Sequence, residues 1–98
     1  MKIKYSFKAE IWLYQGQGAW FFVTLPQEES SQIKIITAPH KKGWGVVRVS
    51  ATIGKTTWQT SIFPYAKSAA YILPIKAEVR RKEKITAGDL VQVALELI

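Results

Sequence analysis

Apolar and polar residues alternate along the first fourteen positions of the chain. One parity is held by Ile3, Tyr5, Phe7, Ala9, Ile11 and Leu13, and the positions between them are mostly lysine, serine or glutamate. A period of two over this length is typical of a half-buried strand. Gly16 and Gly18 then allow a tight turn, and residues 19–25 resume with aromatic and β-branched side chains. The pattern predicts an antiparallel hairpin formed by strands over residues 2–14 and 19–25.

The segment after this hairpin begins with a helix signal. Pro26 presets the backbone for a first helical turn, and Glu28 and Glu29 place negative charge at the positive end of the helix dipole. We therefore expect a short helix that ends near residue 34. A polar, basic loop is expected over residues 40–43.

A second hairpin is predicted in the middle of the chain. Residues 44–53 and 56–63 alternate again on either side of Gly54, which is suited to a tight hairpin turn. Pro64 is expected to end the second of these strands, because proline cannot donate to the hydrogen-bond ladder. These are the third and fourth predicted strands.

The last third of the chain predicts a strand, a helix and a final strand. Residues 71–75 are apolar enough for a fifth strand, and residues 76–83 have the spacing of a short amphipathic helix. Residues 90–98 alternate and predict a sixth strand. Six strands and two short helices indicate a mainly β fold, which we expect to be a small closed or split β-barrel forming a single domain over residues 1–98.

Size and composition limit what such a domain can do. The chain has 98 residues, which is room for one hydrophobic core, and its four Trp, four Tyr and four Phe are a generous supply of large rings. The absence of cysteine excludes disulfides, thiolate metal sites and cysteine nucleophiles. The formal charge of +7 permits attraction to nucleic acid or to anionic ligands.

No segment has the pattern of a targeting or membrane-spanning sequence. The N-terminal residues run directly into the alternating pattern and leave no apolar stretch typical of a signal peptide. The longest apolar run, residues 19–23, is the length of a strand and far short of the roughly 20 residues that span a bilayer. We therefore expect a soluble, cytoplasmic protein that does not interact with a membrane.

Several stretches of the sequence carry a resemblance to a known family. They read KGWGVVRV at residues 42–49, WQTSIFP at 58–64, LPIKAEVR at 73–80 and ITAGDLVQV at 85–93. Together with FKAEIW in the first strand and VTLP before the first helix, they resemble the bacterial family called domain of unknown function 1905. The likeness extends over nearly the whole chain.

The resemblance implies a fold and assigns no activity. That family is similar in fold to the double-split β-barrels, a class that includes the swapped-hairpin transition regulators and antitoxins of the AbrB and MazE type. The local similarity to this class lies in Val79-Arg80, Ile85 and Gly88-Asp89. The chain departs from the class at Pro74, which lies further from Arg80 than usual, and at Lys84, where glycine is common. The resemblance therefore implies architecture rather than chemistry.

Residues suited to catalysis are scarce. His40 is the only histidine and Asp89 the only aspartate, and nothing near Ser61 has the pattern of a nucleophile elbow. Asp89 is expected to hold a turn by accepting backbone N–H bonds. Ser61 and Lys76 are a conceivable serine–lysine pair, although a solvated Lys76 is the simpler interpretation. We therefore expect no enzyme activity, no metal site and no cofactor.

Two tryptophans are candidates for a binding site. Trp44 stands between two glycines that let a ligand approach closely, and Trp58 lies on the next strand. If both rings face one cavity, with an arginine at its mouth, the site suits a small anionic or aromatic ligand. The alternative is that both rings belong to the core. Our first hypothesis is a non-enzymatic module for such a ligand or a protein partner, with a site formed by Trp44, Arg48, Trp58, Ser61 and Arg80.

A basic run on the second predicted helix supports a different hypothesis. The run consists of Arg80, Arg81, Lys82 and Lys84, four cations that could bind phosphates. The alternative is a solvated helix face that Glu78 and Glu83 partly neutralise. Our second hypothesis is a DNA-binding or antitoxin-like regulator acting as a dimer. The first hypothesis allows either a monomer or a homodimer.

Overall fold

Strands make up most of the structure, and both predicted helices are present. The computed structural model describes residues 2–16, 18–40 and 45–98. The strands are β1 (Lys4–Glu10), β2 (Trp12–Gly16), β3 (Gly18–Thr24), β4 (Val47–Ile53), β5 (Thr56–Tyr65), β6 (Ala70–Pro74) and β7 (Leu90–Leu97). The helices are α1 (Gln27–Thr37), the short 3-10 helix η1 (Ala38–His40) and α2 (Ala77–Glu83). The expected fold class, mainly β and barrel-like with two short helices, is confirmed.

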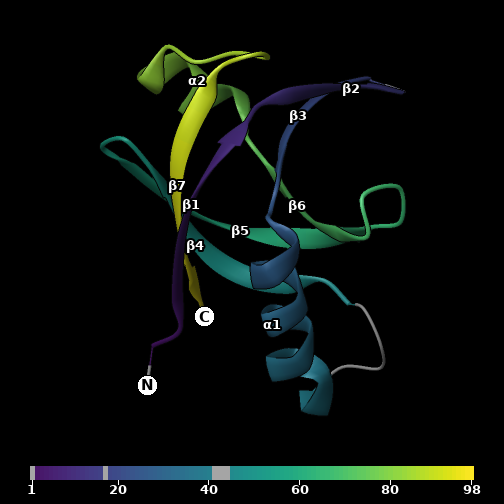
Figure 1. Cartoon of the computed structure of the whole chain (residues 1–98). Helices are drawn as coiled ribbons and strands as arrows, with labels where there is room; N and C mark the ends of the chain where they lie inside the picture. The colour runs from purple at the N-terminus through teal and green to yellow at the C-terminus, as the bar shows by residue number, and fades with distance from the viewer. Residues whose placement is uncertain (1, 17, 41–44) are drawn as a thin grey trace.

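The strands pair into one antiparallel sheet that curls on itself. Their order is β1-β7-β4-β5-β6-β3-β2. β1 and β2 follow each other in the chain but lie at opposite ends of this order, so the sheet has to bend for the chain to connect them. β5 changes partner along its length, because residues 56–62 pair with β4 and residues 63–65 pair with β6. Figure 1 shows the resulting curled sheet, with α1 and α2 at opposite ends.

Ile11 divides the first predicted strand into two. Its N–H donates to the carbonyl oxygen of Asp89 at 2.9 Å, and its own carbonyl accepts the N–H of Gly88 at 2.8 Å. The side chain is fully buried. The chain changes partner here, because β1 pairs with β7 and β2 pairs with β3. The described chain therefore has seven strands rather than six, and Leu13, which the pattern assigned to the buried face, is exposed.

Pro64 does not end β5, contrary to the sequence prediction. β5 continues to Tyr65, and Pro64 lies opposite Tyr71 of β6. The pairing of β4 with β5 ends at Val47 and Ile62. Because β4 makes no pairs beyond that point, the ladder on that side requires no N–H from Pro64, which is the position that proline tolerates in a sheet.

α1 extends beyond its predicted end. It follows Pro26 and continues to Thr37 rather than stopping near residue 34. Ile33 is fully buried, and the hydroxyl of Ser30 accepts the backbone N–H of Tyr71 at 3.0 Å. Both residues lie within the predicted span and hold the helix against the rest of the fold. In the added last turn, the hydroxyl of Thr37 donates to the carbonyl oxygen of Ile33 at 2.8 Å. Within the described ranges, neither helix has the length and apolar character needed to cross a bilayer.

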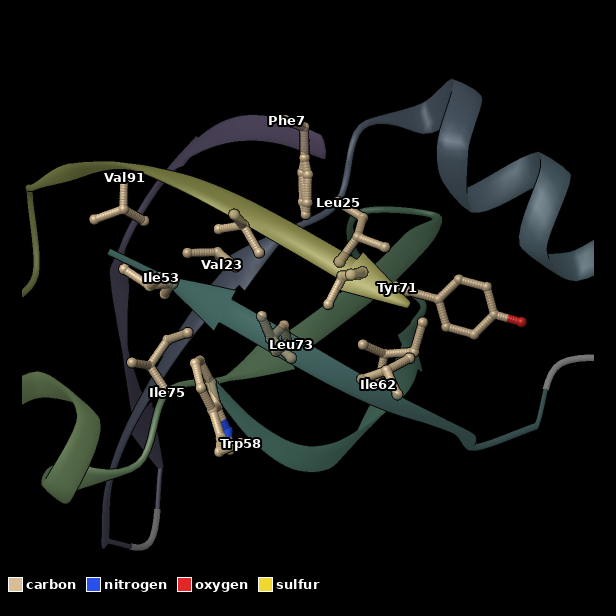
Figure 2. Packing of buried hydrophobic residues seen from close by; sticks show 14 of the residues in the cluster. Phe7, Val23, Leu25, Ile53, Trp58, Ile62, Tyr71, Leu73, Ile75 and Val91 are labelled. Atoms are coloured by element: carbon tan, nitrogen blue, oxygen red, sulfur yellow. The ribbon is translucent and has the colours of Figure 1, made fainter. Parts of the chain in front are cut away.

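The hydrophobic core fills the inside of the curl. Its largest fully buried side chains come from most elements and include Ile11, Leu25, Ile33, Ile62, Tyr71, Leu73, Ile75 and Leu95. Figure 2 shows Phe7, Val23, Ile53 and Leu73 directed into this space from different strands. Trp58 belongs to the same cluster and is only 8% exposed, so it has the core role that was the alternative to a binding role.

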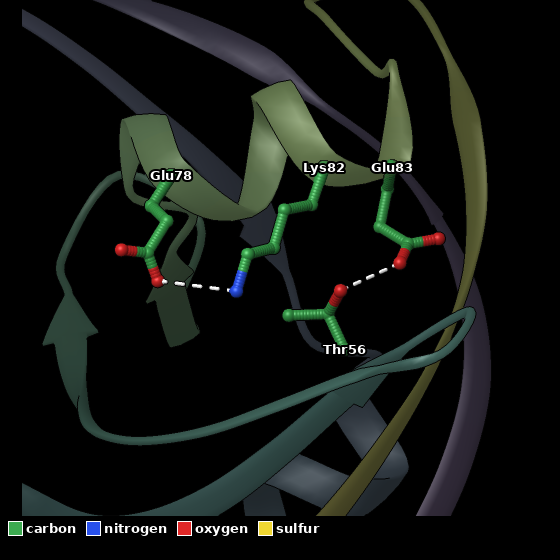
Figure 3. A network of polar contacts seen from close by, with 4 residues as sticks. All are labelled: Thr56, Glu78, Lys82 and Glu83. Carbon is green, nitrogen blue, oxygen red and sulfur yellow. Dashed lines mark hydrogen bonds and ion pairs between the residues drawn. The ribbon is translucent and has the colours of Figure 1, made fainter.

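A carboxylate fixes α2 to the turn between β4 and β5. Glu83 accepts a hydrogen bond from the hydroxyl of Thr56 at 2.6 Å (Figure 3). It also accepts one from the backbone N–H of Lys55 at 3.3 Å. Gly54 has φ of +59°, and a Cβ at this position would collide with the Glu83 carboxylate. Glycine therefore suits the positive φ of the turn, and a side chain at this position would displace the Glu83 carboxylate. This contact and the buried Val79 hold α2 against the sheet.

Candidate functional site

The outer surface of one half of the sheet is covered with rings. It is formed by β2, β3, β6 and the end of β5, and we call it the aromatic face. Its members are Trp12, Tyr14, Trp20, Phe22, Phe63, Tyr65 and Ile72. All of them except Trp12 line an open hollow of about 320 Å³. Trp20 is 50% exposed, Tyr14 40% and Phe63 38%, so a large apolar area remains in contact with solvent.

Strand register gathers these side chains on one face. The facing pairs are Trp12 with Phe22, Tyr14 with Trp20, and Phe63 with Ile72. Opposite residues on one face of an antiparallel pair are close neighbours. β6 lies between β3 and β5, so the pairs from the two ladders adjoin each other. The aromatic face therefore follows directly from the pairing of the strands.

Phe22 lies at the centre of the ring contacts. Its ring is 6.1 Å from that of Trp20 and nearly parallel to it, with an interplanar angle of 9°. Trp12 contacts Phe22 at 5.2 Å, and Tyr14 meets it edge-on at 6.4 Å. The indole N–H of Trp12 donates to the hydroxyl of Thr24 at 2.9 Å, which fixes the orientation of that ring. Trp20 is the most exposed member of this stack and covers Phe22 from outside.

Sequence reasoning missed the aromatic face, although a signal for it existed. Within residues 19–23, Phe21 and Val23 face the core, whereas Trp20 and Phe22 face outward. Apolar residues at both parities are typical of a strand that is covered on both sides. The sequence predicts a hairpin strand for this run. Its apolar residues at both parities are the signal that both sides of this strand carry apolar side chains.

A second hollow adjoins the aromatic face at Trp20. We call it the basic groove; its volume is about 390 Å³, and its lining includes Trp20, Phe21, Trp58, Ile75, Lys76 and Arg80. The guanidinium carbon of Arg80 lies 3.7 Å from the centre of the Phe21 ring, and its Nε donates to the carbonyl oxygen of Ile75 at 3.1 Å. Lys76 is exposed at the start of α2. Among the described residues, no carboxylate lines either hollow.

The structure brings together some residues of the first binding hypothesis and separates others. Trp58 and Arg80 both line the basic groove. Arg48 and Ser61 face each other across β4 and β5, and the guanidinium donates to the Ser61 hydroxyl at 3.2 Å. By strand alternation Ser61 lies on the opposite face of β5 from Trp58, on the side that carries Phe63. Trp44 lies outside the described residues.

The four cations of the second hypothesis lie in different environments. Arg80 is half-buried in the basic groove. Arg81, Lys82 and Lys84 are exposed, and Lys82 forms an ion pair of 3.6 Å with Glu78 (Figure 3). Lys84 ends α2 in a left-handed conformation, with φ of 56°. Duplex DNA binding through these residues stays a prediction.

Each residue considered for catalysis is placed by a contact or an element of the fold. Asp89 accepts the backbone N–H of Thr86 at 2.8 Å, which is the turn-holding role expected for it. Ser61 accepts a hydrogen bond from Arg48, and Lys76 borders the basic groove. His40 lies in η1. In the ranges that the structure describes, no three His, Asp or Glu side chains gather as metal ligands would.

The other half of the sheet presents a polar outer surface, which we call the polar face. It surrounds a hollow of about 370 Å³ and consists of Lys4, Ser6, Ser50, Thr52, Thr57, Ala94 and Glu96. The hydroxyls of Thr52 and Thr57 share a hydrogen bond of 2.8 Å, and Gln92 donates to the hydroxyl of Ser6 at 2.7 Å. Such a polar outer surface is usual for an antiparallel sheet that faces solvent on one side.

Comparison with known proteins identifies the family. A search of curated proteins returns no match for this chain. A family model described as "Domain of unknown function (DUF1905)" matches residues 7–95, a range that includes the aromatic face, the basic groove and the core. The match covers nearly the whole chain and agrees with the motifs quoted from the sequence. The chain therefore belongs to the domain of unknown function 1905 family.

Proposed function

We propose that this protein is a non-enzymatic binding module whose ligand-contacting surface is the aromatic face. The observation that carries the proposal is the half-exposed indole of Trp20, parallel to Phe22 at the edge of an open, ring-lined hollow. Such an arrangement offers a flat surface on which another ring can stack. The ligand class that it favours is a flat aromatic group.

Physical chemistry supports contact at this surface. Large exposed apolar patches on soluble domains mark interaction sites more often than isolated exposed residues do. Stacked or edge-on ring pairs contribute about 0.5–1.5 kcal/mol beyond the burial of their area. A ligand ring placed against Trp20 and Tyr14 would gain both terms, because about half of each side chain is still exposed.

The chemistry of the face favours binding over catalysis. The side-chain polar atoms in its hollow are the hydroxyls of Tyr14 and Tyr65 and the indole nitrogen of Trp20. No carboxylate, histidine or amine lines the hollow within the described chain. General acid–base catalysis needs a group with a pKa near the working pH, and nucleophilic catalysis needs an activated nucleophile. What the face offers is stacking and dispersion.

The test uses the indole N–H signals of ¹⁵N-labelled protein in NMR spectra. Caffeine is a suitable probe, because it is flat, neutral and soluble. We expect caffeine to shift the indole signal of Trp20 and to leave that of buried Trp58 nearly unchanged. The Trp20 variants lack this indole, so their binding is followed by the backbone amide signals of β2 and β3. Trp20→Phe should retain binding, whereas Trp20→Ala should weaken it.

A matched control is available on the other half of the molecule. Leu90 is 67% exposed and is not a member of the aromatic face, so Leu90→Ala removes exposed apolar surface without touching the hollow. Caffeine should bind this variant as it binds the original protein. A caffeine titration that leaves the Trp20 signal unmoved, or that Trp20→Ala does not weaken, would contradict the proposed function.

A further inference from the structure

We propose that the ligand is a single-stranded nucleic acid, whose bases stack on the aromatic face and whose phosphates bind Lys76 and Arg80 in the basic groove. This inference rests on the proposed function, because it requires the aromatic face to take flat rings. It adds the identity of the ligand and a second contact surface.

The two hollows meet at one side chain. Trp20 lines both the ring-lined hollow of about 320 Å³ and the basic groove of about 390 Å³. A polymer that stacks a base on this indole therefore extends directly into the groove that carries Lys76 and Arg80. Stacking rings beside a positively charged groove are the combination with which proteins bind single strands without reading their sequence.

Arg80 is held in place before any ligand arrives. Its guanidinium lies over the Phe21 ring at 3.7 Å, and its Nε donates to the carbonyl of Ile75 at 3.1 Å. These contacts use one face of the group and its Nε, whereas a phosphate is recognised through the Nη edge. An arginine fixed in this way loses less side-chain freedom when it binds an anion. The contact with Phe21 therefore holds the Arg80 guanidinium in a position from which it can bind a phosphate.

The distribution of charge favours a polyanion. The chain carries a formal charge of +7. Several carboxylates are engaged elsewhere: Glu78 with Lys82, Glu83 with Thr56, Asp89 with Thr86 and Glu96 with Lys2. Within the described residues, none lines the aromatic face or the basic groove. An apolar protein partner would need no cations beside the rings, whereas a nucleic acid needs both surfaces.

A single strand fits better than a duplex. The bases of a duplex are stacked on each other and cannot lie flat on Trp20 and Tyr14, whereas unpaired bases can. The proposed contact through the aromatic face therefore differs from duplex binding by the exposed cations of α2. It also predicts little preference among sequences, because every base has a flat face.

The test measures binding of a fluorescent twelve-nucleotide oligothymidylate by anisotropy at low and physiological salt. An oligouridylate distinguishes RNA from DNA, and a twelve-pair duplex distinguishes one strand from two. We expect either single strand to bind more tightly than the duplex. Trp20→Ala should weaken single-strand binding roughly 5- to 150-fold, the loss that corresponds to one stacked base. Trp20→Phe should restore most of it.

Two charge variants test the basic groove. Lys76→Gln should reduce the slope of log K against log salt concentration by about 0.7, the contribution of one phosphate contact on a single strand. Arg81→Gln removes the same charge from an exposed position on α2 that does not line the groove, so its slope should match that of the original protein. Equal losses in the two variants would overturn the assignment of the groove.

The outcomes separate this inference from the proposed function. If caffeine shifts Trp20 but neither oligonucleotide binds at low salt, the inference is wrong and the proposed function stands. If oligonucleotides bind and Trp20→Ala changes nothing, attachment is by charge alone and the stacking inference is overturned. If neither caffeine nor the oligonucleotides bind, both are wrong. Because Trp20 is half exposed, its variants are expected to fold, and well-dispersed amide spectra would verify this.

Discussion

The polar face and the aromatic face are the outer surfaces of two halves of one curled sheet. On the polar face, β1, β7 and β4 carry hydroxyl and charged groups that bond among themselves, such as Thr52 with Thr57. On the aromatic face, β2, β3 and β6 carry rings, and Trp20 and Tyr14 remain exposed. Both halves share the same core on their inner sides.

β5 shows the change most directly, because it belongs to both halves. Its outer side chains are Thr57, Gln59 and Ser61 while it pairs with β4, and Phe63 and Tyr65 once it pairs with β6. One strand thus changes from polar to aromatic on a single face at the point where its partner changes. The half of the sheet with the polar face shows that strands of this fold can pair without aromatic rings on their outer surface. This difference is what the proposed binding role of the aromatic face would explain.

The largest effect is expected for Phe22→Ala. Phe22 is 8% exposed and is surrounded by Trp12, Tyr14 and Trp20, so its removal leaves a cavity beneath the face. We expect a loss of about 3 kcal/mol in the free energy of unfolding, measured by chemical denaturation. The exposed Phe63→Ala is the matched control and should lose clearly less. Equal losses would show that burial within the face does not distinguish these two rings.

A smaller effect is expected for Glu83→Ala, which cuts the contact between α2 and the β4–β5 turn. Glu83 accepts hydrogen bonds from Thr56 and from the backbone of Lys55, and hydrogen bonds to a charged group are stronger than neutral ones. We expect a loss of about 1–2 kcal/mol in the free energy of unfolding. Oligonucleotide binding should also weaken, because α2 carries Arg80.

Glu78→Gln is the matched control for this variant. Its ion pair with Lys82 is exposed on the same helix, and such pairs contribute at most about 0.5 kcal/mol. If the two glutamate variants prove equally stable, the contact of Glu83 with the turn does not hold the helix.

The smallest effects on stability are expected for two variants that compare the aromatic face with the polar face. Trp20→Ala and Thr52→Val each alter one outer side chain and leave the core intact. We expect Thr52→Val to change the free energy of unfolding by less than about 1 kcal/mol, and Trp20→Ala to cost about 1 kcal/mol because its indole is half covered by its contact with Phe22. Caffeine and oligothymidylate binding should fall only in the Trp20 variant. A comparable loss in the Thr52 variant would contradict the division into a binding face and an inert one.

Local patterns in the sequence predicted the family, the mainly β barrel-like fold, the Gly54 turn and α2. They failed where a distant contact decides the structure. Ile11 divides a strand that alternates without interruption, because its backbone bonds to Gly88 and Asp89 near the other end of the chain. No pattern around residue 11 carries that information.

Two of the residues that the sequence suggested for a binding site lie together in the structure, but most of the candidate site was not predicted. Arg80 and Trp58 were chosen from the sequence and do line one groove. The aromatic face was not foreseen. The alternation already places Trp12 and Tyr14 on the outer side, opposite Leu13. Only the pairing of β2 with β3 brings them beside Trp20 and Phe22. A site assembled from several ladders depends on strand order, which the sequence pattern does not provide.

The most direct test is an amide footprint of the ¹⁵N-labelled protein during titration with oligothymidylate, compared with the footprint of caffeine. The account predicts that both ligands shift signals of β2, β3 and the end of β5. Oligothymidylate should in addition shift residues 76–80, and the polar face should stay unchanged with both ligands. Footprints that gather on Ser50, Thr52 and Ala94 while the Trp20 signals do not move would contradict it.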